Sequence, residues 1–365
     1  MRISKFAKFI PPFLLGSALL SVATHLVPGI VSTPVDDYIK DNDMPAAYLD
    51  LFHVKNTRIY HRYNPLYPFH LGGLGTRIVI EEAKELDRPA DKAVAYGLSV
   101  PAGYYLAFDR MFSTFIPPYH SIDAFSIKNT GSLNERAHFV RPPGAIDMDD
   151  TIEAFTKFDD VSYQSKTDPK TLAQLFKEYI FLHELRHGDQ DRKAHDLSNE
   201  GDADVYALKA LAYAHPDKKE AIKEINDLTY NLRVINGAKG GFVHATSDII
   251  AHGETSYLSA AVEQRSMSNL HYILNDFVEH NKKELSSIDT KIEKRYHVAK
   301  AIAGMPDIPA LPHLKRLANE FTQSVEFFNA RNAKPLLQEP EKYKTLDLEA
   351  MEKTYIPAPN LIPTS

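Results

Sequence analysis

The clearest alternation of apolar and polar positions in this chain lies between Asp168 and Gly188. Large apolar side chains recur there at three- and four-residue spacing, as on one face of an α-helix: Leu172, Leu175, Phe176, Tyr179 and Ile180. Asp168 and Pro169 suit the N-cap and the first position of such a helix, and Gly188 suits its end. His183 and His187 continue the apolar stripe. The pattern predicts a helix with two histidines on its buried side, where an imidazole needs a partner such as a metal ion.

A second helix is predicted from Ser198, a suitable N-cap, to about Ala214. Glu200 and Asp204 lie one turn apart on a partly apolar face of this helix. Two carboxylates at this spacing repel each other unless a positive group lies against them. A zinc ion and the ring N–H of a histidine would supply that group. Together the two predicted helices cover residues 169–214.

The residues before these helices predict a small β-sheet. Thr76 to Ile80 is rich in β-branched residues, and Arg136 to Arg141 alternates like a strand and stops at two prolines. The stretch from Tyr60 to Gly75 contains prolines and glycines and predicts a loop. Its aromatic side chains could line a substrate groove or pack the loop onto the core.

The residues after the two helices predict further helices. Helical periodicity continues in four segments, at residues 218–236, 255–283, 287–303 and 312–328. A glycine-rich loop is expected at residues 237–241. The predicted fold class is therefore α+β, with a small β-sheet preceding the histidine helix and a largely α-helical carboxy-terminal half.

The two ends of the chain differ in character from its middle. A short basic region, with Arg2, Lys5 and Lys8, precedes an uncharged run over residues 9–33. Residues 1–32 are typical of a signal peptide or signal anchor, and the alternative is an apolar helix of the folded core. Residues 334–365 are rich in proline and predict an extended tail. Residues 33–333 would then form the folded domain, exported to the periplasm or the extracellular space, with membrane contact only through an amino-terminal anchor.

Composition narrows the function classes. The chain has 365 residues, of which 44% are hydrophobic, enough to bury a substantial core. Its net charge is −6, and its 42 basic residues are scattered among 48 acidic ones, so no nucleic-acid partner is expected. The chain has no cysteine, which excludes disulfides, a thiolate zinc site and a cysteine nucleophile. Any zinc ion must be held by histidines and carboxylates.

A hydrolytic zinc site needs three protein ligands and one open position. His183 and His187, four residues apart on a helix, can both reach one ion. Glu200 is the leading third ligand because it stands near the start of the next helix. Three residues are rivals for that place: His195, Asp191 and Asp202.

Other residues could assist these ligands. Glu184, beside the first histidine, could act as general base on the attacking water. Asp204 could accept a hydrogen bond from the histidine ring nitrogen that faces away from the metal. His244 and His252 could stabilise an oxyanion. The alternative is that both are ordinary surface or loop histidines without a catalytic role.

These residues resemble the HExxH metallopeptidases, the zincins, and within them the gluzincin-like branch whose third ligand is a glutamate. The sequence His183-Glu184-Leu185-Arg186-His187 matches the first motif, and Glu200-Gly201-Asp202-Ala203-Asp204 matches the second, ExxAD. The resemblance covers residues 168–204.

The resemblance implies a zincin-like fold, Zn²⁺ as cofactor and a peptide or protein as substrate. It also implies His183, His187 and Glu200 as ligands, Glu184 as catalytic base and Asp204 as the partner of a ligand. In such peptidases a strand beside the cleft pairs with the substrate, and Arg136 to Arg141 is the candidate here. Only twelve residues separate His187 from Glu200, a shorter gap than in most such peptidases.

Three other interpretations use the same residues. The chain could be a metal-dependent amidase that acts on cell-wall peptides. It could be a non-enzymatic envelope protein with a purely structural metal site, in which His195 fills the fourth position. Finally, two buried histidines could be satisfied by neighbouring carboxylates without any metal.

Overall fold

The structure is a computed structural model that describes most of the chain between residues 19 and 329. The described ranges are 19–24, 26–52, 56–61, 63–115, 124–129, 137–156, 165–190, 197–241, 244–253, 257–283, 285–288, 290–305 and 313–329. His195 and the predicted tail, residues 334–365, lie outside them. The described part is mixed α and β, mostly helical, with one four-stranded sheet, so the coarse fold class is confirmed.

The chain divides into two compact units. The first comprises residues 1–146, 176–190 and 213–216, and the second comprises residues 147–175, 191–212 and 217–365. The predicted domain limits at residues 32 and 333 stay predictions.

The sheet belongs to the first unit and has the strand order β1-β2-β4-β3. These strands are β1 (Ser32–Pro34), β2 (Thr57–Tyr60), β3 (Phe125–Asn129) and β4 (Ala137–Arg141). β2 pairs with β1 antiparallel and with β4 parallel, and β3 pairs with β4 antiparallel. The strand predicted at residues 136–141 is therefore confirmed as β4. Because β4 is hydrogen-bonded on both sides, it has no free edge for a substrate peptide, and that part of the expectation is wrong.

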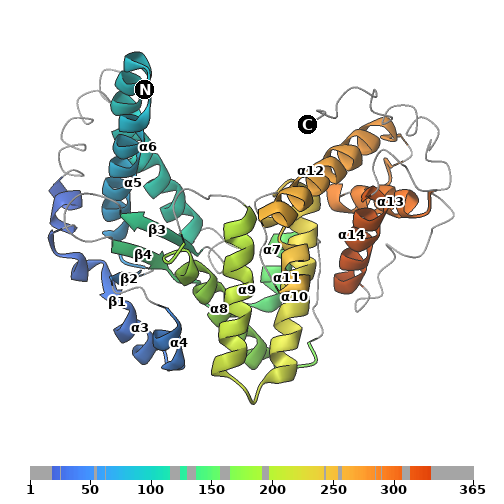
Figure 1. The fold of residues 1–365 in the computed structure, drawn as a ribbon, viewed down its shortest axis with the longest axis horizontal. Helices are drawn as coiled ribbons and strands as arrows, with labels where there is room; N and C mark the ends of the chain where they lie inside the picture. The colour runs from blue at the N-terminus through green and yellow to red at the C-terminus, as the bar shows by residue number, and fades with distance from the viewer. Residues whose placement is uncertain are drawn as a thin grey trace. The chain divides into compact units, whose positions relative to one another are not determined.

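The stretch predicted as a loop from Tyr60 to Gly75 is mostly helical. Helix α5 runs from Tyr67 to Glu85, and α6 from Pro89 to Phe115 lies beside it (Figure 1). The strand predicted at residues 76–80 is also wrong, because these residues belong to α5. A Cβ added at Gly75 would lie 3.0 Å from the Cα of Gly103 on α6. The glycines thus permit close helix packing here and do not mark a loop.

The aromatic residues of that stretch pack onto the core of the first unit. One cluster of buried side chains contains Val31, Tyr60, Tyr67, Leu71, Leu74 and Phe139. The hydroxyl of Tyr60 lies 2.7 Å from Nδ1 of His70. Packing onto the core, rather than lining a substrate groove, is therefore what the structure shows for Tyr60 and Tyr67. The first unit also contains the 3-10 helix η1 (Pro28–Ile30), α3 (Val35–Asp41) and α4 (Ala47–Leu51).

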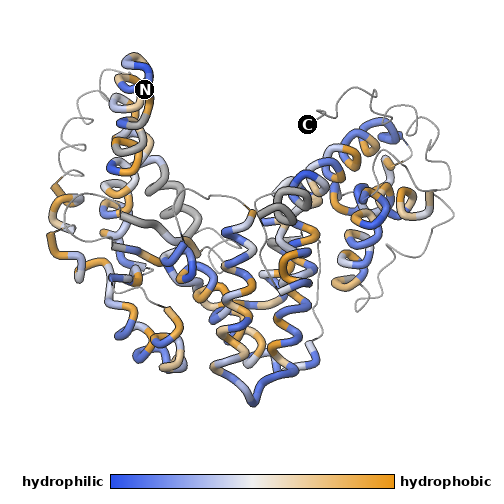
Figure 2. Tube along the Cα trace, in the orientation of Figure 1, coloured by the Kyte–Doolittle hydropathy of each residue, from blue (hydrophilic) through white to orange (hydrophobic). Residues whose placement is uncertain are grey.

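The second unit is helical in its described part. Its helices are α7 (Met148–Thr156), α9 (Leu197–Ala214), α10 (Lys219–Lys239), α11 (Ser247–His252), α12 (Tyr257–His280), α13 (Lys291–Ala303) and α14 (Leu314–Asn329). Hydrophobic and hydrophilic residues alternate along α9 and α10 (Figure 2), as expected for helices with one buried face. The four later helical segments are therefore confirmed. The predicted loop at residues 237–241 begins late, because α10 continues to Lys239 and ends at Gly240 with φ 105°.

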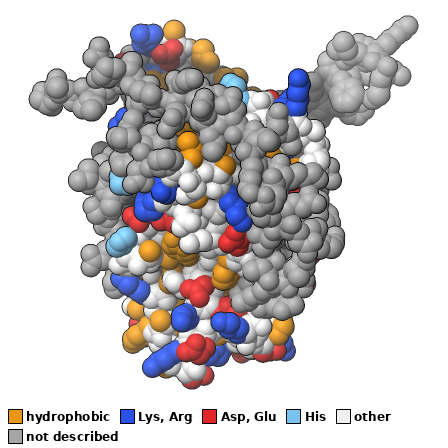
Figure 3. Space-filling view, turned by 90° about the vertical axis from the view of Figure 1, so that its right-hand side faces the viewer, with side chains coloured by type: hydrophobic (Ala, Val, Ile, Leu, Met, Phe, Trp, Pro, Cys, Tyr) orange, Lys and Arg blue, Asp and Glu red, His pale blue; other side chains and the backbone are white. Residues whose placement is uncertain are grey.

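Two surface properties bear on partners. No helix in the described ranges is long and apolar enough to cross a membrane. On the face drawn in Figure 3, basic and acidic side chains are interspersed, in keeping with the scattered charges of the sequence.

Candidate metal centre

Helix α8 (Pro169–Arg186) carries the two motif histidines and begins as its sequence predicts. The backbone N–H and the hydroxyl of Thr171 each donate to Oδ2 of Asp168, at 2.9 Å. These two hydrogen bonds to the ionised carboxylate lower the pKa of Asp168. Four residues of the apolar stripe, Leu172, Leu175, Phe176 and Tyr179, are buried, and so is His183, whereas Ile180 and His187 are only partly buried. The capped helix is confirmed, and the prediction of two histidines on its buried side holds for His183 alone.

The end of α8 lies against the sheet of the first unit. A Cβ added at Gly188 would overlap the imidazole of His138, which is buried on β4 and lies 3.3 Å from the hydroxyl of Thr57. Gly188 does not adopt a positive φ, unlike Gly240 and Gly253. Glycine is therefore required here by the close approach of His138 and not by a left-handed turn.

The two histidine rings present the same nitrogen to each other. Nε2 of His187 lies 3.2 Å from Nε2 of His183, and the rings are nearly perpendicular, at 89°. Nδ1 of His187 lies 2.7 Å from Oε1 of Gln190. Since an amide oxygen only accepts, Nδ1 of His187 carries the proton, and the lone pair of a neutral ring is then on Nε2. Gln190 thus fixes the tautomer that a metal ligand needs.

Glu200 lies near the start of α9 and completes a candidate ligand group. One ligand atom from each of His183, His187 and Glu200 lies within 4.8 Å of the other two, a group that could hold a metal ion. Ligand atoms at about 2.1 Å from a tetrahedral zinc ion lie about 3.4 Å apart. The 3.2 Å separation of the two Nε2 atoms matches that geometry. The residues therefore fit a zinc ion, although the group does not by itself identify the metal.

His244 lies beside this carboxylate. Its Nδ1 is 3.0 Å from Oε2 of Glu200, and its ring is partly exposed. The two atoms are in close polar contact, and the predicted contribution of His244 to oxyanion binding stays a prediction. His252, the other histidine considered for that role, is exposed on α11 and contacts Asp248 of its own helix. It is not part of the ligand group.

Asp204, the second acidic residue of the ExxAD motif, is fully buried. Nε and Nη2 of Arg233 donate to its two oxygens at 2.9 and 2.7 Å, and the hydroxyl of Thr246 also donates to Oδ2. These contacts join α9 to α10 and to the residue before α11. The predicted hydrogen bond from a histidine ring to Asp204 stays a prediction.

Two of these residues were missed in the sequence. Gln190 could have been found as an amide three residues after His187, just beyond the helix end. Arg233 gave no such signal, because an isolated arginine on a helix is usually exposed.

The remaining predicted site residues are placed as follows. Glu184 follows His183 on α8 and is partly exposed. The rival third ligands His195 and Asp191 lie outside the described residues.

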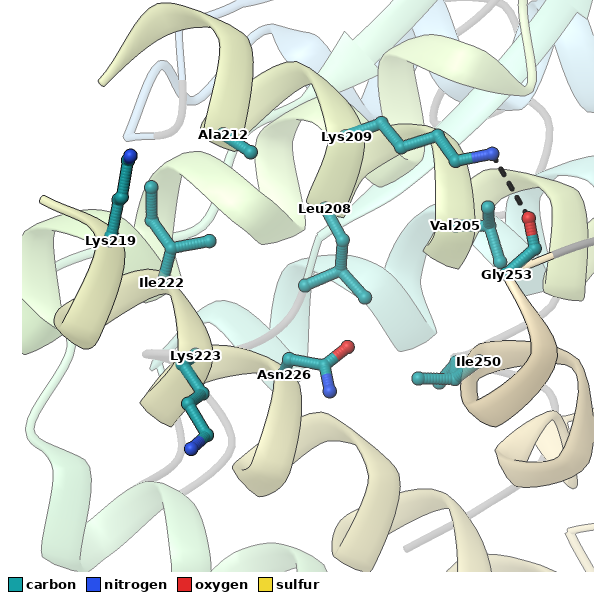
Figure 4. Close-up of a pocket in the computed structure, with 10 residues that line it drawn as sticks. All are labelled: Val205, Leu208, Lys209, Ala212, Lys219, Ile222, Lys223, Asn226, Ile250 and Gly253. Carbon is teal, nitrogen blue, oxygen red and sulfur yellow. Dashed lines mark hydrogen bonds between the residues drawn. The ribbon is translucent and has the colours of Figure 1, made fainter. Parts of the chain in front are cut away.

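The second unit also contains a pocket of about 400 Å³ that is separate from the ligand group. Its apolar lining comes from α9, α10 and α11 and includes Leu208, Ile222 and Ile250 (Figure 4). Lys209 reaches across to donate to the backbone oxygen of Gly253 at 3.0 Å. Neither Glu184 nor any of the three candidate ligands lines this pocket.

Comparison with protein-family models, curated proteins and solved structures gives no significant match.

Proposed function

We propose that this chain is a zinc-dependent metallopeptidase. The observation that supports the proposal is the convergence of one ring nitrogen from each of His183 and His187 and one carboxylate oxygen of Glu200 within 4.8 Å of one another. Nδ1 of His187 is hydrogen-bonded to Gln190, and its Nε2 lies 3.2 Å from Nε2 of His183. Without a metal, the Nε2–H of His183 would donate to Nε2 of His187; a bound ion would replace that hydrogen bond with a bond to each nitrogen.

Zn²⁺ would be held by His183, His187 and Glu200, leaving a fourth position open. When bound there, the ion would polarise the scissile carbonyl and favour ionisation of the attacking water. Glu184 directly follows His183, the first ligand, in the sequence and would accept a proton from that water. The same carboxyl group would then donate the proton to the departing nitrogen as the C–N bond breaks and the new C–O bond remains. Gln190 would hold His187 in the required tautomer, and His244 would orient Glu200.

Metal content and peptide cleavage, measured on the same purified proteins, test this proposal. The parent should bind one zinc ion per chain and cleave peptides. His187→Ala should lose the metal, while His280→Ala, which alters an exposed histidine on α12, should retain it. Glu184→Gln should retain the metal and lose cleavage. A parent protein without stoichiometric zinc under metal-replete conditions would overturn the proposal.

The same experiment separates the two alternatives that share these residues. Cleavage of cell-wall stem peptides but not of proteins would identify the chain as an amidase of that class. Zinc binding without any hydrolysis, together with no effect of Glu184→Gln, would identify a structural metal site in a non-enzymatic envelope protein.

A further inference from the structure

Helix α6 has its polarity reversed relative to a helix that faces water. No charged residue occurs from Ala93 to Tyr105. Five large side chains of this stretch are exposed: Val94 by 60%, Tyr96 by 43%, Leu98 by 56%, Val100 by 43% and Tyr105 by 75%. Val94, Leu98 and Tyr105, the three most exposed, lie four and seven residues apart and form one stripe along the helix. The side chain of Ser99, by contrast, is buried. A helix of a water-soluble protein normally buries its large apolar side chains and exposes its small polar ones.

Glycines bring α5 and α6 close together. A Cβ added at Gly72 would lie 3.0 Å from the ring of Tyr104, and one added at Gly103 would overlap the backbone oxygen of Gly72 and the hydroxyl of Thr76. Small residues at a helix interface allow the backbones to approach closely, and this is the characteristic packing of helices in a bilayer. Tyr104 of α6 packs into this interface, whereas Val94, Leu98 and Tyr105 are exposed.

The described amino-terminal residues show the same reversal. Residues 19–24 are helical, and Leu19, Val22 and Leu26 are exposed by 62%, 56% and 77%. Their small neighbours Ser21 and Thr24 are buried. Ser21 forms a hydrogen bond with Tyr104 of α6, which joins this segment to the helix pair.

Three hydroxyl groups of these helices are hydrogen-bonded to the backbone of their own helix. The hydroxyl of Thr24 donates to the backbone oxygen of Leu20 at 3.0 Å, that of Thr76 to Gly72 at 2.8 Å, and that of Ser99 to Tyr96 at 2.8 Å. Each acceptor is a carbonyl of the same helix, three or four residues earlier. Such bonds satisfy a hydroxyl group where no solvent reaches it.

We propose that the exposed apolar stripes of α6 and of residues 19–26 form a surface that docks on a lipid bilayer. We call this the apolar face, and its residues are Leu19, Val22, Leu26, Val94, Leu98 and Tyr105. Exposed apolar side chains and a helix contact mediated by glycines are together typical of helices that contact lipid. The basic residues Arg2, Lys5 and Lys8 precede this segment in the sequence and would attract anionic headgroups.

The length of the uncharged stretch favours a helix lying in the membrane interface. The residues from Ala93 to Phe108 carry no charge, and 16 helical residues span about 24 Å. The hydrocarbon core of a bilayer is about 30 Å thick. The apolar face would therefore insert into one leaflet without crossing the membrane. This proposal does not depend on the metal site.

The absence of tryptophan from the chain allows a direct test on the full-length protein. Leu98→Trp places a single tryptophan on the apolar face, and Tyr272→Trp places one at a similarly exposed site, 62%, on α12. On addition of vesicles of phosphatidylcholine and phosphatidylglycerol, emission from Leu98→Trp should shift to the blue. It should also be quenched when brominated lipids replace ordinary ones. Tyr272→Trp should show neither effect.

A second pair of variants tests the contribution of the face to binding. Leu98→Glu with Tyr105→Glu should lower the vesicle partition constant roughly tenfold or more, because two carboxylates would enter the apolar layer. Tyr213→Glu with Tyr272→Glu, at exposed sites outside the apolar face, should leave it unchanged. If the emission wavelength of Leu98→Trp does not change when vesicles are added, the proposal is wrong. A blue shift that instead grows with protein concentration in their absence would also overturn it, and would identify a second copy of the chain as the occupant.

Discussion

Replacing Asp204 by alanine should destabilise the second unit strongly, even without metal. Asp204 is 0% exposed and its partner Arg233 is 13% exposed at the side chain. Two hydrogen bonds, at 2.9 and 2.7 Å, join the guanidinium to the carboxylate. Removal of the carboxylate leaves the guanidinium charge buried and uncompensated, and leaves the hydroxyl of Thr246 without this acceptor.

The expected loss is about 3–5 kcal/mol, the cost of removing one partner from a buried ion pair. For a unit of this size the loss corresponds to a fall of about 10 °C in the thermal unfolding midpoint. Asp202→Ala, which removes a partly exposed carboxylate from the same helix, is the matched control and should cost less than about 1 kcal/mol.

Unfolding by urea, followed by circular dichroism on chelator-treated protein, provides the measurement. The double variant Asp204→Leu with Arg233→Met should lose less stability than the sum of the losses in the two single variants, because neither the carboxylate nor the guanidinium is then buried without its partner. An unchanged midpoint for metal-free Asp204→Ala, combined with weaker zinc binding, would refute this reasoning. Asp204 would then act through a histidine ring, as the motif resemblance implies.

Three further predictions concern other parts of the chain. Gln190→Ala should weaken zinc binding about 10- to 100-fold in a chelator competition, because His187 loses the acceptor that fixes its tautomer; equal affinity would exclude that role. Gly188→Ala should cost about 1–3 kcal/mol in urea unfolding, because its methyl group would overlap His138; an unchanged midpoint would show that the strand can yield. Burial, and secondarily the charge of Lys300, lowers the pKa of His297 from 6.5 to about 4. Since the unfolded chain takes up the proton first, stability should fall as the pH drops from 6.5 to 4, and His297→Gln should reduce that fall in thermal unfolding scans.

The sequence predicts well those elements whose local signals agree with their surroundings. In α8 the N-cap at Asp168, the proline after it and the apolar stripe all indicate the same helix, and its described bounds match within two residues. The later helices were predicted for the same reason. The group formed by His183, His187 and Glu200 was also predicted, because helical spacing alone brings two of its members together.

Predictions failed where a contact distant in sequence determines the local structure. Gly188 was correctly predicted to lie at the end of its helix, but the reason it must be glycine was not, because the ring of His138, fifty residues earlier, is what leaves no room for a side chain. Arg136 to Arg141 was correctly predicted as a strand. Its interior position depends on β2 and β3, whose order along the sheet has no local signal. The pairing of Asp204 with Arg233 likewise joins two helices whose individual patterns are ordinary.

The failure at α5 has a different cause, which bears on the proposed membrane contact. The rule that glycine breaks a helix and that apolar residues face inward assumes water outside. Gly72 and Gly75 are helical because their missing side chains admit α6, and Val94, Leu98 and Tyr105 face outward. Both observations contradict the rule for a soluble helix pair, and both follow if lipid replaces water at the outer face. If Leu98→Trp proves insensitive to vesicles, that explanation fails, and the exposed stripe must be covered by protein.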